Sequence, residues 1–288
     1  MVRSRGERIF EVFNYLILTL LAIVTLAPFL HVVAKSLSHE AAVMAGEVGL
    51  WPVGLNLQTY RAVLANYHFW SSFYISVFVT VTGTVLHVLV MSLVAYPLSR
   101  EEMVGRRFIT LLFVFIMLFH GGLIPTYLIV KALGLTNKVW ALILPGLVST
   151  FNMIVLRNYF ASIPDSLEES ARLDGCGNIG TFFRIVFPLS LPAVATVCVY
   201  TAVGFWNNYF SALIYIDSKS LYPLSLYLRK VVVETESQLV DLNPELRNLN
   251  PESVRAATVV AATIPILIVY PFLQRYFVKG IMLGAVKE

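Results

Sequence analysis

The sequence is poor in charged residues, which make up 13% of its 288 positions. Soluble domains of average type are about 25% charged, so this composition excludes an ordinary soluble protein. The 58% share of hydrophobic residues and the mean hydropathy of +0.76 agree with that exclusion. The net charge of +4 does not require nucleic acid as a partner, because positive residues near membrane ends give the same bias. The sequence therefore predicts a membrane protein.

Cysteine is nearly absent as well. Cys176 falls in a predicted loop and Cys198 in a predicted span, which argues against a disulfide framework. The sequence has no spacing of cysteine and histidine that is typical of a metal site. We expect Cys176 to be a small filler rather than a reactive thiol.

The long apolar runs contain no Asp, Glu, Lys or Arg. Ion-driven carriers usually need a buried acid or base for the coupling ion, so the sequence argues against such a carrier. The chain also lacks the G-x-x-x-x-G-K-[ST] phosphate loop of many ATPases. Energy for uphill transport must then enter from another polypeptide, through a cytoplasmic contact surface. The alternatives to a transport subunit that another polypeptide drives are a stand-alone channel or carrier, and a membrane anchor that recruits a soluble enzyme.

Six of these uncharged runs are long enough, or nearly so, to cross a bilayer, which needs about 20 helical residues. We expect crossings at residues 12–34, 70–97, 108–130, 139–156, 189–214 and 256–273. The fourth and sixth runs are short, so their helices should extend into flanking polar residues. The first run is too long for a signal-peptide core and predicts an uncleaved helix. The sequence thus predicts an all-α protein, with residues 1–288 forming a single transmembrane domain.

The distribution of Lys and Arg favours an orientation with both termini in the cytoplasm, because the short inner loops are the more basic. Aromatic residues near Trp70 and Trp140 then lie at the outer membrane interface. Two long outer segments follow, at residues 36–67 and 215–254. The second is too apolar in places for a disordered linker, and it either meets a partner or folds onto the protein's own helices.

One compact charged segment, at residues 161–188, interrupts the apolar chain on the cytoplasmic side. Asp165 and Ser166 are each followed three residues later by Glu, the spacing of a capping box at a helix start. Gly175 predicts a left-handed helix stop, and a second short helix is expected over about 178–187. The pattern indicates a short helix at the membrane surface that could transmit a movement of a soluble partner to the spans.

This segment resembles the cytoplasmic motif of permeases in binding-protein-dependent ABC importers: E-A-A, three residues, G, nine residues, I, one residue, L-P. The positions that match this spacing are Glu169, Ser170, Ala171, Gly175, Ile185, Phe187 and Pro188. Ser170 replaces the middle Ala of the motif, and Phe187 replaces its Leu. Asp174 is similar to the sugar-importer version of the motif.

The resemblance covers nearly the whole chain. Residues 204–216 and 276–288 resemble the fifth span and the C-terminus of sugar permeases, and the C-terminus touches the ATPase in some relatives. Residues 120–146 resemble the subgroup that serves complex oligosaccharides, including permeases of alginate importers. The similarity to alginate permeases is one of the overall sequence and not of a motif that recognises uronate. The predicted spans contain no basic residue that would bind a uronate.

The resemblance implies a type I ABC importer permease fold, with six transmembrane helices and a coupling helix between helices 4 and 5. It implies alternating access in a bacterial cytoplasmic (inner) membrane, with membrane lipid around the subunit. It further implies a homologous permease partner, two ATP-binding subunits that carry ATP and Mg, and an extracytoplasmic sugar-binding protein. The chain itself is then a transport subunit without an ATPase site, a cofactor or a metal.

The resemblance also implies which residues couple transport to the ATPase. These coupling residues are Glu168, Glu169, Ser170, Ala171, Arg172, Asp174, Gly175, Ile185 and Pro188. Glu169 has a second possible role, because an acid near a helix N-terminus stabilises the helix dipole by about 0.3–1 kcal/mol. Arg172 either pairs with Glu168 four residues earlier or reaches the partner.

A break is predicted in the third span, where His120, Gly121 and Gly122 are followed closely by Pro125. Broken helices often line substrate cavities in transporters. The alternative is a kink that only serves packing.

The fifth span contains polar residues that are candidates for the substrate pathway. Trp206 could stack on a pyranose ring, and the amides of Asn207 and Asn208 could bind sugar hydroxyls. Hydrogen bonding between helices is the alternative. Asn152 and His87 are weaker candidates for the same pathway.

Overall fold

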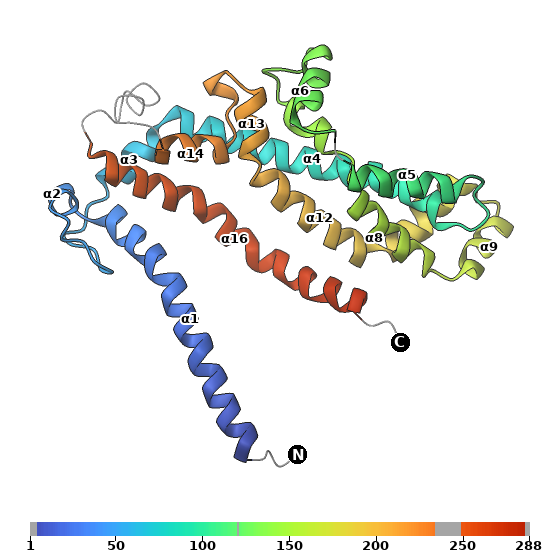
Figure 1. The fold of residues 1–288 in the computed structure, drawn as a ribbon, viewed down its shortest axis with the longest axis horizontal. Helices are drawn as coiled ribbons and strands as arrows, with labels where there is room; N and C mark the ends of the chain where they lie inside the picture. Colours follow the sequence, from blue (N-terminus) through green and yellow to red (C-terminus); the bar gives the residue numbers. More distant parts are fainter. Residues whose placement is uncertain (1–4, 120, 234–248, 286–288) are drawn as a thin grey trace. The chain divides into compact units, whose positions relative to one another are not determined.

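The computed structural model describes residues 5–119, 121–233 and 249–285, and its elements in this part are helices (Figure 1). Apart from helices, these residues form one isolated antiparallel bridge, between Ser38 and Leu55. The prediction of an all-α protein is therefore confirmed. The chain divides into two compact units, residues 1–69 with 230–266 and residues 70–229 with 267–288. The prediction of a single transmembrane domain stays a prediction.

The first unit begins with a long apolar helix. Its elements are α1 (Arg5–Leu37), α2 (Glu40–Met44), α3 (Gln58–Ala65), the start of α4 (Tyr67–Ser99) and the first part of α16 (Pro251–Ala285). Apolar side chains from Ile9 to Leu26 are exposed along α1, which is typical of a membrane span. Near its end, the Lys35 ammonium lies 2.8 Å from the Glu252 carboxylate of α16.

The second unit contains the charged segment. In addition to most of α4 and the last part of α16, its elements are α5 (Arg106–Leu118), α6 (Leu123–Ala132), α7 (Trp140–Ile143), η1 (Leu144–Gly146), α8 (Thr150–Ala161), α9 (Asp165–Leu173), α10 (Asn178–Thr181), η2 (Phe182–Val186), α11 (Phe187–Leu189), α12 (Leu191–Trp206), α13 (Tyr209–Tyr215), η3 (Lys219–Leu221) and the start of α14 (Leu224–Val233). Helix α8 packs against α5 and α12. The buried core joins α4, α8 and α12 through residues such as Met91, Met153, Phe160 and Val197.

Within the part of the chain that the structure describes, three helices are long and apolar enough to cross a membrane by themselves: α1, α4 and the first part of α16. Further crossings require bent pairs, for example α7–η1 with α8, which meet at 53°, and residues 178–189 with α12, which meet at 80°. Counting each bent pair as one span gives up to six, so the prediction of six crossings stays a prediction. The short fourth and sixth runs do extend into polar residues, since α8 ends at Ala161 and α16 begins at Pro251.

The two predicted outer segments are largely ordered where the structure describes them. Residues 36–67 hold α2 and α3, and residues 215–254 hold η3 and α14 before the stretch 234–248, which lies outside the described residues. At the start of α14, the Leu224 N–H donates a hydrogen bond to Ser76 Oγ of α4 at 2.7 Å. This part of the segment therefore folds onto the protein's own helices, one of the two predicted alternatives.

Candidate functional site

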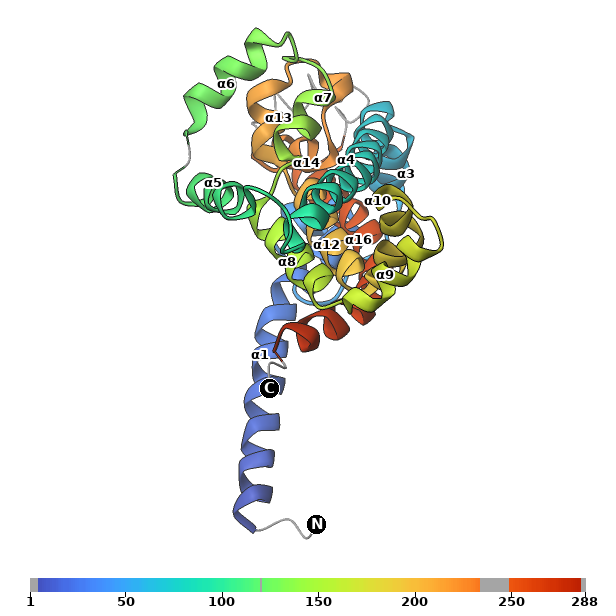
Figure 2. The same cartoon turned by 90° about the vertical axis from the view of Figure 1, so that its right-hand side faces the viewer.

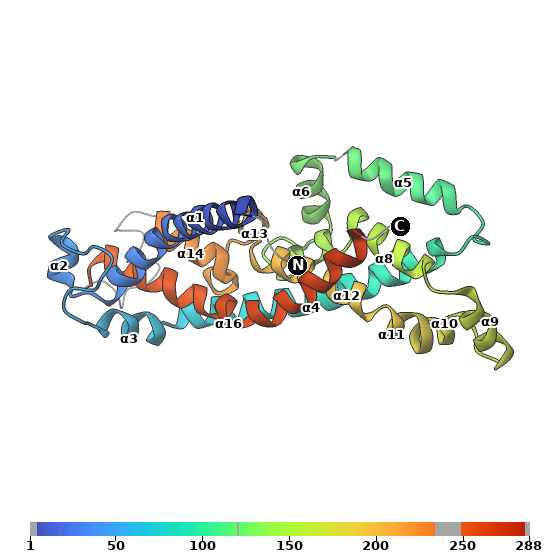
Figure 3. The same ribbon diagram turned by 90° about the horizontal axis from the view of Figure 1, so that it is seen from below.

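The charged segment folds as a helix followed by a second helical run, as predicted (Figure 3). Its start differs from the prediction, because the N-cap of α9 is Pro164, which makes no side-chain capping bond. The predicted capping box at Asp165 and Ser166 is therefore wrong. The fixed φ of proline suits the position before a helix, and Asp165 lies inside the first turn, where its carboxylate meets Arg100 instead.

The end of α9 follows the prediction. Gly175 has a φ of +82°, in the left-handed region that favours glycine. The N–H of Cys176 donates to the Ala171 carbonyl at 2.9 Å, which closes the turn. Apart from its chain neighbours, no atom of the described residues would lie within 4 Å of a Cβ on Gly175. The backbone conformation, and not crowding within the chain, therefore selects glycine here.

The second helical run, Asn178–Leu189, confirms the short helix predicted over 178–187, and it has a π-helical stretch at its centre. Phe182 anchors this stretch to the spans, because its ring lies 5.1 Å from that of Tyr96 and 6.1 Å from that of Phe160, between ring centroids. At the bend before α12, Ser190 Oγ donates to the Val186 carbonyl at 2.7 Å. The run is thus packed against α4 and α8.

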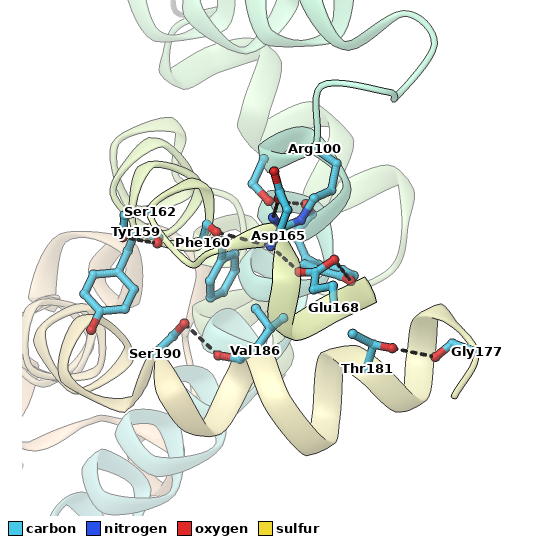
Figure 4. A network of polar contacts seen from close by, with 12 residues as sticks. Arg100, Tyr159, Phe160, Ser162, Asp165, Glu168, Gly177, Thr181, Val186 and Ser190 are labelled. Atoms are coloured by element: carbon cyan, nitrogen blue, oxygen red, sulfur yellow. Dashed lines mark hydrogen bonds and ion pairs between the residues drawn. The ribbon is translucent and has the colours of Figure 1, made fainter. Parts of the chain in front are cut away.

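A buried ion pair joins the charged segment to α4 (Figure 4). Arg100 follows the last residue of α4, and its guanidinium pairs with Glu168, whose side chain is 5% exposed. The same guanidinium lies 3.3 Å from the exposed carboxylate of Asp165 and donates to the Phe160 carbonyl at 3.2 Å. Tyr96 adds a hydroxyl that donates to Glu168 Oε2 at 3.2 Å. One arginine thereby connects α4, α8 and α9.

This arrangement excludes one of the two alternatives left open for Arg172, its pairing with Glu168. Among the described residues, the Glu168 carboxylate pairs with Arg100, and its predicted pairing with Arg172 is wrong. The reason is that the Glu168 carboxylate is buried, where Arg100 and the Tyr96 hydroxyl hold it, whereas Arg172, one turn further along α9, is exposed. Arg100 was not predicted, because nothing in the local sequence shows which acid an arginine at the end of a span will meet.

The predicted coupling residues differ in exposure. The exposed ones are Glu169, Ser170, Arg172, Asp174, Gly175 and Pro188, while Ile185 is half-buried. Glu168 and Ala171 are buried, so they act within the fold and not on its surface. Two exposed apolar side chains were missed, Leu173 at 89% and Ile179 at 76% exposure. Their position on either side of the glycine turn would have been the signal for an apolar contact surface.

A second cluster, buried and polar, lies where α4, α8 and α12 meet. The Nδ1 of His87 lies 3.0 Å from the Gly146 carbonyl, which can only accept, so Nδ1 carries the proton. The other ring nitrogen then accepts a hydrogen bond from Asn152 Nδ2 at 2.8 Å. Asn152 Nδ2 also donates to Thr201 Oγ1 at 3.3 Å. These contacts favour the helix–helix role of His87 and Asn152 over a role in the substrate pathway.

We expect Asn152→Ala to lower the free energy of unfolding by about 1 kcal/mol, because hydrogen bonds between membrane helices contribute about 0.6–2 kcal/mol. The substitution leaves the acceptor nitrogen of His87 without its donor. Unfolding in detergent measures the loss, and Asn158→Ala on the exposed side of α8 is the matched control. A shift in the sugar concentration for half-maximal transport, at unchanged stability, would instead assign Asn152 to the substrate pathway.

Phe205 packs beside this cluster, between two glycines. A Cβ built on Gly83 of α4 would lie 2.8 Å from the Phe205 ring, and one on Gly146 would lie 3.2 Å from it. His87 and Thr201 each lie one helical turn from this contact, at Gly83 and Phe205 respectively. The two glycines therefore allow the ring of α12 to approach both α4 and the bend before α8.

The predicted fifth span is broken at its polar residues. Helix α12 ends at Trp206, and Asn208 caps α13 by accepting a hydrogen bond from the Ser211 N–H at 3.1 Å. Asn207 is exposed, and its amide donates to the Val203 carbonyl at 3.0 Å. The Trp206 ring contacts Phe73, with 6.3 Å between centroids. Asn208 thus has a structural role, and a contact of Trp206 and Asn207 with sugar stays a prediction.

The third predicted span is interrupted at the glycines, as expected. Helix α5 ends at Leu118 and α6 begins at Leu123 (Figure 2). Gly122 precedes α6 with a φ of +85°, while Gly121 is exposed. His120 lies outside the described residues. A role of this break in the substrate pathway stays a prediction.

Comparison with known proteins gives matches over most of the chain. The sequence model for "Binding-protein-dependent transport system inner membrane component" matches residues 62–283. The chain is 43% identical over 284 residues to the polygalacturonan/rhamnogalacturonan transport system permease protein YtcP of Bacillus subtilis (strain 168), covering 98% of this chain and 99% of that protein. It is 30% identical over 247 residues to the arabinooligosaccharides transport system permease protein AraQ of the same organism, with coverages of 82% and 83%.

A solved structure is similar as well. It is the crystal structure of a bacterial ABC transporter involved in the import of the acidic polysaccharide alginate. One of its chains matches with a TM-score of 0.88 and 34% sequence identity, covering 96% of this chain and 99% of that chain. The likeness in sequence and in fold therefore extends over both units of the chain.

Proposed function

The chain belongs to the family of binding-protein-dependent transport system inner membrane components, and we propose that it forms the translocation pathway of an ATP-driven oligosaccharide importer together with a homologous permease. As a family member it is an inner-membrane permease subunit of a sugar ABC importer, with the type I permease fold. The proposed substrate is an oligosaccharide from a uronate-containing polysaccharide, such as alginate or polygalacturonan. The relatives that transport polygalacturonan and alginate support this substrate class.

The proposed partners divide the work of transport. Two ATP-binding subunits hold ATP and magnesium, and an extracytoplasmic binding protein delivers the sugar. The predicted spans of this chain contain no Lys or Arg. We therefore assign recognition of the uronate carboxylates to the partner permease or to the binding protein. Both termini of this chain lie in the cytoplasm in this proposal.

The proposed mechanism is alternating access, driven through α9. When ATP closes the ATPase dimer, the exposed surface around Glu169 and Leu173 moves with it. Because Arg100 binds Glu168 of α9 and follows α4 directly, this movement is passed to α4. Phe182 passes it to α8 through its packing on Phe160. The bundle then opens outward to receive sugar, and it opens inward again after hydrolysis.

The observation that carries the coupling proposal is this pairing of an exposed surface with a buried connection in one short segment. Leu173 and Ile179 expose apolar side chains to a partner, while Glu168 and Ala171 are fixed inside. A stand-alone channel or carrier would not need such a surface. A simple membrane anchor would not need the buried connection to two spans.

In this proposal Glu169 faces a basic group of the ATPase subunit. We therefore expect Glu169→Lys to lower sugar-stimulated ATPase activity by at least about tenfold, because like charges across an interface disfavour binding by several kcal/mol. Glu169 is exposed, so the subunit itself should still fold and accumulate in the membrane. The assay uses the assembled complex in liposomes, with alginate or galacturonate oligosaccharides as stimulants and a neutral maltooligosaccharide as comparison. Stimulation by the neutral sugar alone would contradict the proposed substrate class.

Gly175 offers a matched pair of variants in the same assay. Asparagine tolerates the left-handed conformation of Gly175 better than other residues, whereas tryptophan adds both strain and bulk. Gly175→Asn should therefore keep the turn and lose part of the coupling, and Gly175→Trp should lose nearly all of it. Normal ATPase stimulation in both Gly175→Trp and Glu169→Lys would defeat the coupling assignment, whatever the substrate is.

A further inference from the structure

An open cavity of about 530 Å³ lies where α4 and α5 are connected, apart from the coupling segment and the buried polar cluster. Its lining is rich in arginine and includes Arg106, Arg107, Arg157, Glu101, Thr110 and Leu111. Arg106 and Arg107 begin α5, and Arg157 comes from α8. Three positive side chains from two helices thus surround one space.

The positive charge of this cavity is only partly balanced within the chain. Among the described residues, the ion pair found here joins Arg106 to Glu101 at 3.6 Å, and the Glu101 side chain is 95% exposed. Arg157 uses its Nε to donate to the Leu98 carbonyl at 2.9 Å, which leaves its two terminal nitrogens for other acceptors. The cavity therefore keeps a net positive charge.

Two neutral groups add hydrogen-bond donors to the same space. The Thr110 hydroxyl is buried and has no hydrogen-bond partner among the described residues, although Thr110 lines the cavity. The N-cap of α5 is Gly105, which has no side chain to bind the first N–H groups of the helix. Helix N-termini of this kind attract anions, so these donors act in the same sense as the arginines.

The surroundings of the cavity are apolar on one side. Along α5, Phe108, Leu111 and Phe115 are exposed by more than half. In the proposed orientation the start of α5 faces the cytoplasm, so the charged cavity lies at the level of lipid headgroups and these side chains at the level of acyl chains. Basic pockets at this level bind anionic headgroups in membrane proteins.

We propose that this cavity binds a phosphate-type anion, held by Arg106, Arg107 and Arg157 with the Thr110 hydroxyl as a further donor. The phosphate of an anionic lipid headgroup is one source and soluble phosphate is the other. The position of the site in the membrane rests on the proposed function, but its binding of phosphate does not. Failure of transport and failure of this site can therefore be told apart.

The test is native mass spectrometry of the purified transporter complex, titrated with phosphatidylglycerol or with phosphatidylcholine of the same acyl chains. Phosphatidylglycerol should bind more tightly, and each of Arg107→Gln and Arg157→Gln should weaken it about fivefold, the usual effect of one basic residue near a membrane surface. Arg157→Lys keeps the charge and should bind nearly as the wild type does. Arg61→Gln, on exposed α3, is the matched control and should have no effect.

A second arm identifies the source of the phosphate. Inorganic phosphate is added at millimolar concentration to the lipid-free complex, and its effect on thermal unfolding is measured with and without the substitutions. Stabilisation of the wild type alone, without a preference for phosphatidylglycerol, would support the site and name soluble phosphate as its ligand. If the double variant Arg107→Gln/Arg157→Gln binds lipid and phosphate as the wild type does, the proposal is overturned. Arg107 is exposed and its side chain makes no hydrogen bond or ion pair with the other described residues, so Arg107→Gln still tests the site if Arg157→Gln fails to fold.

Discussion

Arg100→Ala is expected to lower the free energy of unfolding by about 3–5 kcal/mol, because removing one partner leaves a buried charge without compensation. The stranded group is the Glu168 carboxylate, whose side chain is 5% exposed. The substitution also removes the hydrogen bond to the Phe160 carbonyl and leaves Tyr96 as the polar neighbour of that carboxylate. Chemical unfolding of the purified subunit in detergent measures the loss.

The same arginine supplies its own control. Asp165 also pairs with Arg100, but its side chain is 83% exposed, and exposed pairs contribute only about 0–1 kcal/mol. Asp165→Asn should therefore change stability little, although it removes a charge from the same cluster. Glu168→Ala should be about as harmful as Arg100→Ala, and the double variant should be far less harmful than the sum of the two. Equal effects of Asp165→Asn and Glu168→Ala would show that burial does not decide the strength of this pair.

The functional consequence can be separated from stability. Glu168→Gln keeps the shape of the side chain and a hydrogen-bond acceptor, and it removes only the charge. The subunit should then still fold at low temperature and assemble with its ATPase. If the ion pair passes movement from α9 to α4, basal ATP hydrolysis should persist in this variant while stimulation by sugar falls. Loss of both activities in proportion would indicate a defect of assembly and not of coupling.

The extent of the helices followed from hydrophobicity alone, because a long run without charge has few alternatives to a helix in a membrane. The breaks within the runs were harder to predict from the sequence, and each has a local cause. Gly121 and Gly122 indicated one break, and Pro145–Gly146 is a turn signal that could have indicated another. The break at Asn208 depends on an amide that caps α13, and asparagine has that role only when the following N–H groups are free.

The candidate site was predictable in its exposed half and not in its buried half. The spacing of Glu169 and Gly175 marked the turn correctly, since a left-handed stop needs glycine whatever surrounds it. The orientation of Glu168 depends on Arg100, which is 68 residues away in the chain and pairs with it only through the fold. The same holds for His87 and Asn152, whose hydrogen bond joins two helices far apart in sequence. Local pattern therefore identifies surfaces, and tertiary contact decides which polar groups are linked.

Gly83→Val is expected to destabilise the protein by about 1–3 kcal/mol or more, because overpacking a tight core forces side chains from their preferred positions. The added Cβ alone would lie 2.8 Å from the Phe205 ring, closer than carbon atoms in contact normally approach. The ring cannot retreat freely, since it also packs on Gly146 at the bend before α8. Thermal unfolding of the purified subunit measures the effect.

Gly204→Ala is the control that isolates crowding from helix propensity. Gly204 precedes Phe205 in the same helix, and a Cβ there would meet no atom of the described residues within 4 Å, apart from its chain neighbours and the backbone of its own helix. Alanine in a helix interior is favoured over glycine by about 0.5–1 kcal/mol, so this variant should be as stable as the wild type or more so. Phe205→Leu gives the complementary test, because a smaller side chain should make room at Gly83. The double variant Gly83→Ala/Phe205→Leu should then be more stable than the summed losses of the single variants Gly83→Ala and Phe205→Leu predict. Strictly additive losses would mean that Gly83 and Phe205 do not meet, and that the close approach of α4 and α12 has another cause.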